Sequence, residues 1–282
     1  MTICLIIILF LPLLLGIGLY LKSKLLLDST SVFDILFSKE WSPIEGKFGM
    51  LPFINSSLWV TIIAILIAGP ICLFSAIHLT QYAKKSFLNF MHPIIDILSG
   101  IPSVVYGVWG ILIIVPLVSK YIGPFFGKET TGYSILSGSI VLAVMITPFI
   151  LNILIDIFQT IPKELQEASL SLGATKWQTI KKVILKKALP GIISAITLGI
   201  SRAFGETMAV MMVVGNVTKL KYGVFQPGYP LPALIANNYG EMMSIPMYDS
   251  ALMFAAFILF AIVLLFNFAS RLLIIKYERE IK

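Results

Sequence analysis

The feature that most constrains this chain is a set of six apolar stretches, each long enough to cross a lipid bilayer as a helix. A transmembrane helix needs about 20 predominantly apolar residues. Of the 282 residues, 58% are hydrophobic and only 12% are charged, whereas about a quarter of a typical soluble domain is charged. We therefore predict an all-α polytopic membrane protein with spans near residues 3–21, 55–77, 94–118, 133–155, 189–216 and 251–275.

The polar segments divide the chain into parts. Residues 1–21 are predicted to form an N-terminal transmembrane helix, and 22–50 a mixed polar linker outside the cytoplasm. Residues 51–275 form one compact membrane unit, and 276–282 a short cytoplasmic tail. No polar segment is long enough to hold a soluble catalytic domain.

Basic residues set the predicted orientation. If the loop between the fourth and fifth spans is cytoplasmic, twelve Lys and Arg residues lie in the inside segments and eight in the outside segments. The positive-inside rule then places both termini in the cytoplasm. Lys22 and Lys24, directly after the first span, favour the opposite orientation, but later loops can outvote the first helix. The net charge of +7 thus reflects membrane topology and does not indicate nucleic-acid binding.

Motifs for catalysis and cofactor binding are absent from the sequence. It contains no G-x-x-x-x-G-K-[ST] nucleotide loop, no H-E-x-x-H and no G-x-S-x-G. Cys4 and Cys72 lie far apart in apolar spans, so they form neither a disulfide framework nor a metal-ligand spacing. Asp96 and Asp156 each lie near a predicted helix end and do not form a dyad. We predict a protein that is not an enzyme and needs no cofactor or metal.

The segment between the fourth and fifth spans, near 163–187, has the charge pattern of a cytoplasmic helix. Glu164 and Glu167 lie near its start and four lysines near its end, which matches the helix dipole. Small residues would let another surface approach the backbone closely: Ala168, Ser169, Gly173 and Ala174. Either a partner protein docks on this helix, or the helix lies on the anionic lipid of the inner leaflet.

One motif in this segment favours a partner. EASLSLGATKWQTI resembles the EAA loop of permease subunits in bacterial ABC importers, with Glu167, Ala168, Ser169 and Gly173 at the motif positions. Ser169 replaces the second alanine of the motif but is also small. The resemblance implies a coupling helix that docks in a cleft of an ATPase subunit.

Two further segments extend the resemblance over roughly residues 51–275. GIPSVVYGVWG (100–110) and RAFGETMAVMMVVGN (202–216) resemble the PstC-type permease of phosphate importers. The resemblance implies a type I ABC importer (MetI-like) core in the bacterial inner membrane. It also implies a heterodimer with a PstA-type permease, two PstB-type ATPase subunits and an extracytoplasmic phosphate-binding protein. A permease for molybdate, tungstate or sulfate, or a secondary transporter or channel, remains an alternative.

Arg202 and Glu206 are charged residues inside an apolar span, where an isolated charge costs about 2.5–3.5 kcal/mol or more. Four residues apart, they are expected to share a helix face, and they either neutralise each other or line the path of inorganic phosphate. A guanidinium can donate two parallel hydrogen bonds to an oxyanion. Thr207 is a further candidate donor on the pathway, and Ser103 and Tyr106 of the third span are weaker candidates.

Residues 222–250 are too rich in proline for a span and too apolar for a plain loop. We expect a short helix near 231–243 at the outer surface, either as a receiver for a binding protein or as interfacial packing.

Overall fold

The computed structural model describes residues 2–219, 223–241 and 244–281, and these residues are almost entirely helical. Within them, five helices are long and apolar enough to cross a membrane: Leu51–Tyr82, Ser103–Phe125, Ile135–Gln159, Lys176–Gly205 and Pro246–Ile275. The first predicted span is also a helix, α1 (Thr2–Lys22). The protein is therefore an all-helical membrane protein, as the apolar stretches predict.

The centre of the fold is the contact between α4 (Leu51–Ile77) and α9 (Ile135–Gln159). Small side chains recur at every fourth position of α4 and are fully buried: Ala64, Ala68, Cys72 and Ala76. Small residues at this spacing let two membrane helices approach closely, since lipid gives no hydrophobic drive for association. The helix α12 (Leu185–Gly205) joins this core, and Gly199 lies so close to α9 that a Cβ there would meet Ile150 at 2.5 Å.

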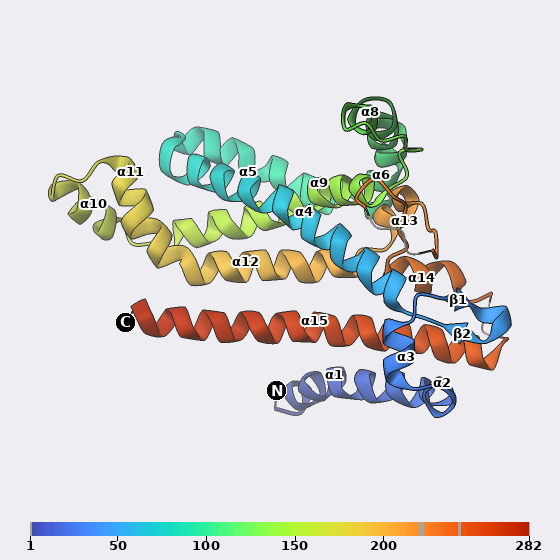
Figure 1. Ribbon diagram of the computed structural model, residues 1–282. Coiled ribbons are helices and arrows are strands. Elements are labelled where there is room, and N and C mark those ends of the chain that lie inside the picture. The colour runs from blue at the N-terminus through green and yellow to red at the C-terminus, as the bar shows by residue number, and fades with distance from the viewer. Residues whose placement is uncertain (1, 220–222, 242–243, 282) are drawn as a thin grey trace.

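α15 (Pro246–Ile281) runs beside α12, and α1 lies on the far side of α15 (Figure 1). Gly16 makes the α1 contact close, because a Cβ at this position would meet the ring of Phe260 at 3.1 Å. The residues expected to form a separate tail, 276–282, continue α15 as far as Ile281.

The expected linker at 22–50 is folded. It forms α2 (Lys24–Ser29), α3 (Val32–Phe37) and a hairpin of β1 (Trp41–Ser42) and β2 (Lys47–Phe48), in which Trp41 pairs with Phe48 and Pro43–Glu45 make the turn. This segment packs on α15 and on the start of α4 through a second hydrophobic cluster.

The short helix expected near 231–243 is present as α14 (Leu231–Asn238). Residues 242–243 of that expectation lie outside the described residues. Leu231 and Leu234 are fully buried in the same cluster as the hairpin, so α14 packs into the protein more than it lies on the surface.

The third span begins later than the sequence suggests, so the expected range 94–118 is wrong. The chain forms α5 (Lys85–Gly100), breaks at Ile101–Pro102 and restarts as α6 (Ser103–Trp109). The break follows from Pro102, which has no N–H and disfavours a helical residue before it. The span then continues to Phe125 with two π-helical turns, through η3 (Gly110–Ile114), α7 (Val115–Leu117), η4 (Val118–Ile122) and α8 (Gly123–Phe125).

The cytoplasmic helix expected at 163–187 is interrupted, so that range is also wrong. α10 (Lys163–Ser171) ends before Gly173, whose φ of +83° lies in the left-handed region that glycine tolerates. Thr175 then caps a new helix through a reciprocal bond with Gln178. This helix, α11 (Lys176–Thr179) with η5 (Ile180–Ile184), runs directly into α12. The four lysines after residue 180 therefore belong to the base of the fifth span.

The elements divide between two ends of the molecule (Figure 1). α10 and α11 lie at one end, together with the π-helical turn η2 (His78–Tyr82) that closes α4. α2, α3, the hairpin and α14 lie at the other end. α1 starts and α15 ends on the side of α10 and α11, which agrees with the prediction that both termini share one side.

Candidate translocation site

The fifth span breaks between Arg202 and Glu206. α12 ends at Gly205, Glu206 is extended with ψ of 124°, and α13 (Met208–Val214) follows. The Glu206 Oε1 atom accepts a hydrogen bond of 3.0 Å from the Ala209 amide, so the carboxylate caps the start of α13. The expectation that Arg202 and Glu206 share one helix face is therefore wrong, because Gly205-Glu206-Thr207 interrupts the helix.

Arg202 lies in the last turn of α12, where a positive charge is favoured by the helix dipole. Its guanidinium carbon is 4.6 Å from the centre of the Phe149 ring on α9, a cation–π contact. Among the described residues, the salt bridges are those of Lys47 with Glu40 and Glu45, so no described carboxylate neutralises Arg202 within 4.0 Å. The side chain is exposed on the surface of this chain.

The broken third and fifth spans pack against each other. A Cβ on Gly107 of α6 would meet the Met212 sulfur of α13 at 2.5 Å and the Ala209 Cα at 3.3 Å, and one on Gly110 would meet Val213 at 2.8 Å. Since the later position in the third span, Gly110, meets a later position in α13, the two segments run parallel. Their starts, at Ser103 and at Met208, therefore lie on the same side of the contact.

The three other pathway candidates, Tyr106, Ser103 and Thr207, lie around these breaks. The Tyr106 hydroxyl donates a 2.9 Å hydrogen bond to the Leu98 carbonyl and so bridges the break between α5 and α6. Ser103 is the first residue of α6 and is half-buried, while the Thr207 hydroxyl donates to the Gly205 carbonyl at 3.3 Å. The structure thus brings all five pathway candidates to the two breaks.

Three residues near the site were not among the candidates. Phe149 supports Arg202, and Asn152, one turn further along α9, donates a 2.7 Å hydrogen bond to Asp96 of α5. The Asn152 Oδ1 atom is buried without a hydrogen-bond partner. Asp96 therefore accepts a hydrogen bond from a neighbouring span. The sequence did not predict this contact, because it placed Asp96 near a helix end. Phe149 and Asn152 are three residues apart and so share one face of α9. This spacing was the one sequence signal that could have pointed to both residues.

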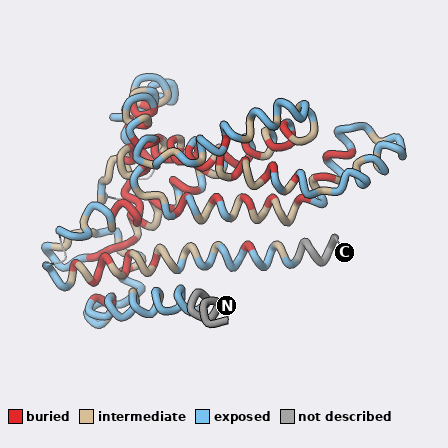
Figure 2. The backbone as a smooth tube through the Cα atoms, turned by 180° about the vertical axis from the view of Figure 1, so that it is seen from behind, coloured by how far each residue is buried: buried red, intermediate tan, exposed pale blue. Residues whose placement is uncertain are grey.

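The first part of the expected coupling segment, α10 and the turn after it, is largely exposed (Figure 2). α10 has no buried residue, and Glu167 and Ala168 are exposed. Ser169 is anchored by a 2.9 Å hydrogen bond between its hydroxyl and that of the buried Thr179. A Cβ on Gly173 would meet nothing within 4 Å, and Ala174 is half-buried. The segment is therefore a free surface on this chain.

Comparison with known proteins identifies this architecture. The model of a family described as "Binding-protein-dependent transport system inner membrane component" matches residues 68–279. The chain belongs to this family. It is thus an inner-membrane, multi-pass transport subunit and not an enzyme.

Relatives of the permease extend over most of its length. It is 35% identical over 273 residues to the "Phosphate transport system permease protein PstC" of Xylella fastidiosa (strain 9a5c), which covers 92% of this chain and 83% of the relative. It is 42% identical over 218 residues to the "Probable ABC transporter permease protein YqgH" of Bacillus subtilis (strain 168), covering 77% and 69%.

A solved structure confirms the fold of the permease. An inward-facing structure of the MetNI methionine ABC transporter matches with a TM-score of 0.64 and 21% identity, covering 84% of this chain and 99% of that one. The MetI-like core expected from the sequence is therefore the fold of this chain.

Proposed function

We propose that this permease imports inorganic phosphate as one half of a heterodimeric pore, and that Arg202 binds the anion during passage. The names of its relatives support phosphate as the cargo. The observation that carries the role of Arg202 is its exposed guanidinium, which has no carboxylate of the described residues within 4.0 Å and lies beside two broken membrane helices. A charge at this depth persists only when it faces a partner, a cavity or a water-filled path.

The anion meets fixed positive charge here without a permanent counter-ion. Arg202 offers two parallel N–H donors to two phosphate oxygens, and the start of α6 brings the Ser103 hydroxyl to the same region. The ring of Phe149 limits how far the guanidinium can turn. Such a site holds phosphate strongly enough to admit it and, with one charged donor, weakly enough to release it.

Glu206 is proposed to select among oxyanions. One of its oxygens caps α13, and a carboxylate can also accept a hydrogen bond from a protonated phosphate oxygen. Sulfate at neutral pH carries no such proton. In Glu206→Gln the amide oxygen still caps the helix while the charge is removed, so the variant isolates selection from folding. Unchanged preference for phosphate over sulfate in competition uptake would rule out this role.

The permease has no nucleotide-binding loop in its sequence, so the energy comes from partner subunits. We infer a PstA-type permease, two PstB-type ATPase subunits and an extracytoplasmic phosphate-binding protein. The exposed α10 and Gly173 turn would seat in an ATPase cleft, and ATP binding would shift the pore between outward and inward access. The switch acts through different affinities of the partners for the two states.

The test is ATP-dependent uptake of radiolabelled phosphate by the reconstituted complex, with wild type beside Arg202→Ala and Arg202→Lys. Loss of uptake in the alanine variant, with normal assembly on a sizing column, is the expected result. The lysine variant keeps the charge but loses the planar donor pair, so it should retain only part of the rate. Full uptake by Arg202→Ala would contradict the proposal.

A permease for another oxyanion is the second candidate, because guanidinium binding alone does not discriminate among tetrahedral anions. Competition by unlabelled molybdate, tungstate and sulfate in the same assay separates the two: phosphate alone should displace the label. Uptake that persists without ATP would instead indicate a secondary transporter or channel.

A further inference from the structure

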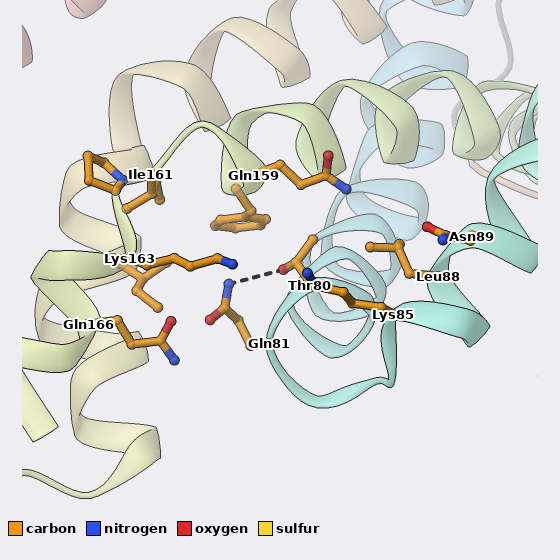
Figure 3. A pocket seen from close by; sticks show the side chains of 12 residues that line it. Thr80, Gln81, Lys85, Leu88, Asn89, Gln159, Ile161, Lys163 and Gln166 are labelled. Atoms are coloured by element: carbon orange, nitrogen blue, oxygen red, sulfur yellow. Dashed lines mark hydrogen bonds between the residues drawn. The ribbon is translucent and has the colours of Figure 1, made fainter.

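At the end of the molecule opposite the hairpin, the helix ends enclose a polar cavity of about 460 Å³. Its walls come from five elements: η2 after α4, the start of α5, the end of α9, the start of α10 and the end of η5. Figure 3 shows side chains from these elements turned toward one another across the space. The polar lining residues are Thr80, Gln81, Lys85, Asn89, Gln159, Lys163 and Gln166.

The lining has one sign of charge. It contains two lysines, and no Asp or Glu among the described residues contributes to it. Neither lysine has a described carboxylate within 4.0 Å, since the salt bridges of the described chain belong to Lys47. In Figure 3 the Lys163 ammonium and the Gln81 amide face the same space, and the Gln81 amide nitrogen donates one hydrogen bond of 3.3 Å to the Thr80 hydroxyl, which leaves its second N–H for a ligand. This arrangement favours an anion with several acceptor oxygens.

We propose that this cavity binds a phosphoryl oxyanion, either free orthophosphate or the headgroup of an inner-leaflet anionic phospholipid. Both present a tetrahedral group with several oxygens to lysine and amide donors, and basic pockets between membrane helices on the cytoplasmic side take such headgroups. The volume exceeds that of one orthophosphate and admits a hydrated anion or a headgroup. The proposal rests on the proposed function only in placing this end in the cytoplasm.

The site joins α10, which buries no residue of its own, to the better-packed ends of the membrane helices. Lys163 and Gln166 belong to α10, which has no buried residue, whereas Lys85 begins α5 and Gln81 lies in η2. A bound anion would tie the ATPase-docking segment to the ends of two membrane helices. It is therefore placed to affect how α10 moves with the ATPase.

The test uses the complex of both permeases and the ATPase subunits in nanodiscs, with Arg202→Ala in every sample so that the cargo site does not contribute. One arm measures binding of radiolabelled orthophosphate in phosphatidylcholine discs. The other measures by native mass spectrometry which lipid is retained from a mixture of phosphatidylcholine and phosphatidylglycerol. Nanodiscs expose both faces, so neither readout depends on transport.

Removing the two charges with Lys85→Gln and Lys163→Gln should weaken binding about tenfold per lysine. The matched control is Lys181→Gln with Lys182→Gln, which removes the same charge from exposed lysines that do not line the cavity. Lys85→Arg with Lys163→Arg should keep binding because both charges remain, and normal assembly of the glutamine pair on a sizing column shows that it still folds. If the glutamine pair loses orthophosphate binding, the ligand of the cavity is the free anion. If it instead loses retained phosphatidylglycerol, the ligand is the lipid headgroup. Equal binding by the glutamine pair and its control in both arms would overturn the proposal.

Discussion

The two ends of this permease are built differently. At the hairpin end, Phe53 is fully buried among the rings of Trp41 and Tyr229, with ring centres 4.9 and 5.3 Å apart, and the hydroxyl of Ser57 binds the Leu231 amide at 2.8 Å. At the other end, α10 buries nothing, and Leu172 keeps 88% of its surface exposed. The first end supplies its own packing, whereas the second presents a surface that a partner can complete.

The largest effect on folding is expected at the hairpin end. Phe53→Ala removes a buried ring and leaves a cavity, which costs about 3–5 kcal/mol. The thermal midpoint of the purified permease in detergent should fall sharply. Ile44→Ala, in the fully exposed turn of the hairpin, is the matched control and should leave the midpoint unchanged. If Phe53→Ala lowered the thermal midpoint only slightly, the second hydrophobic cluster would contribute little to stability. The two ends would then not differ in packing strength.

A bulky residue at the Gly173 turn should damage assembly far more than stability. Gly173→Trp meets open space on this chain, and its left-handed backbone costs about 1–2 kcal/mol. The indole should block docking of the ATPase, measured by co-purification. Gly46→Trp is a control with the same backbone strain, since Gly46 has φ of +71° and nothing within 4 Å, but it lies in the hairpin. Normal co-purification of Gly173→Trp would refute the coupling assignment.

The hydrogen bond that ties α10 to the next helix gives a smaller expected effect. Ser169→Ala leaves the buried Thr179 hydroxyl without its partner and should cost about 1 kcal/mol. Hydrogen exchange of the α10 amides should accelerate, while exchange of the amides in the second hydrophobic cluster should stay unchanged. Ser171→Ala is the control, because the Ser171 hydroxyl only donates to the Glu167 carbonyl on the exposed side of the same helix. Equal exchange in both variants would show that other contacts hold α10.

The membrane spans could be predicted because their length and apolarity follow directly from bilayer thickness. The helix breaks were harder to predict, because a hydropathy window averages the apolarity of many residues and does not resolve single positions such as Pro102 and Glu206. Pro102 carried a local signal, but the role of Glu206 as a cap depends on α13 packing against α6, a contact between residues 100 positions apart. The fold of 22–50 was missed for a similar reason. Its few apolar residues, such as Leu26 and Ile35, become buried only against α4, α14 and α15.

The candidate site was predictable in part. Arg202 stands out because charge is rare in an apolar span, and the two hallmark segments do meet in the structure. Phe149 and Asn152 are ordinary residues of an apolar helix, and only the packing of α9 against α5 and α12 gives them neighbours. The surface of α10 was predicted from its motif, although the turn at Gly173 was not.

The smallest effect is expected from the exposed ion pairs of the hairpin. Lys47 lies 2.8 Å from Glu40 and 3.3 Å from Glu45, and its hydrogen bond and positive charge hold the pKa of Glu40 below its ordinary value. A lowered carboxyl pKa stabilises the folded state above the unfolded pKa of about 4.3, and this contribution is lost as the pH falls further. Lys47→Met should therefore lower the thermal midpoint only slightly at neutral pH, since exposed pairs contribute little and salt screens them.

The difference between Lys47→Met and wild type should disappear in acid, where the carboxyls are protonated in both proteins, and should also shrink at high salt. Because the hairpin is already fixed by the pairing of Trp41 with Phe48 and by the aromatic cluster behind it, the loss should stay far below that of Phe53→Ala. A midpoint loss as large as that of Phe53→Ala would mean that charge and not aromatic packing holds this end of the permease together. A small loss that persists in acid, where the carboxyls are protonated, would mean that Lys47 contributes through packing and not through its ion pairs.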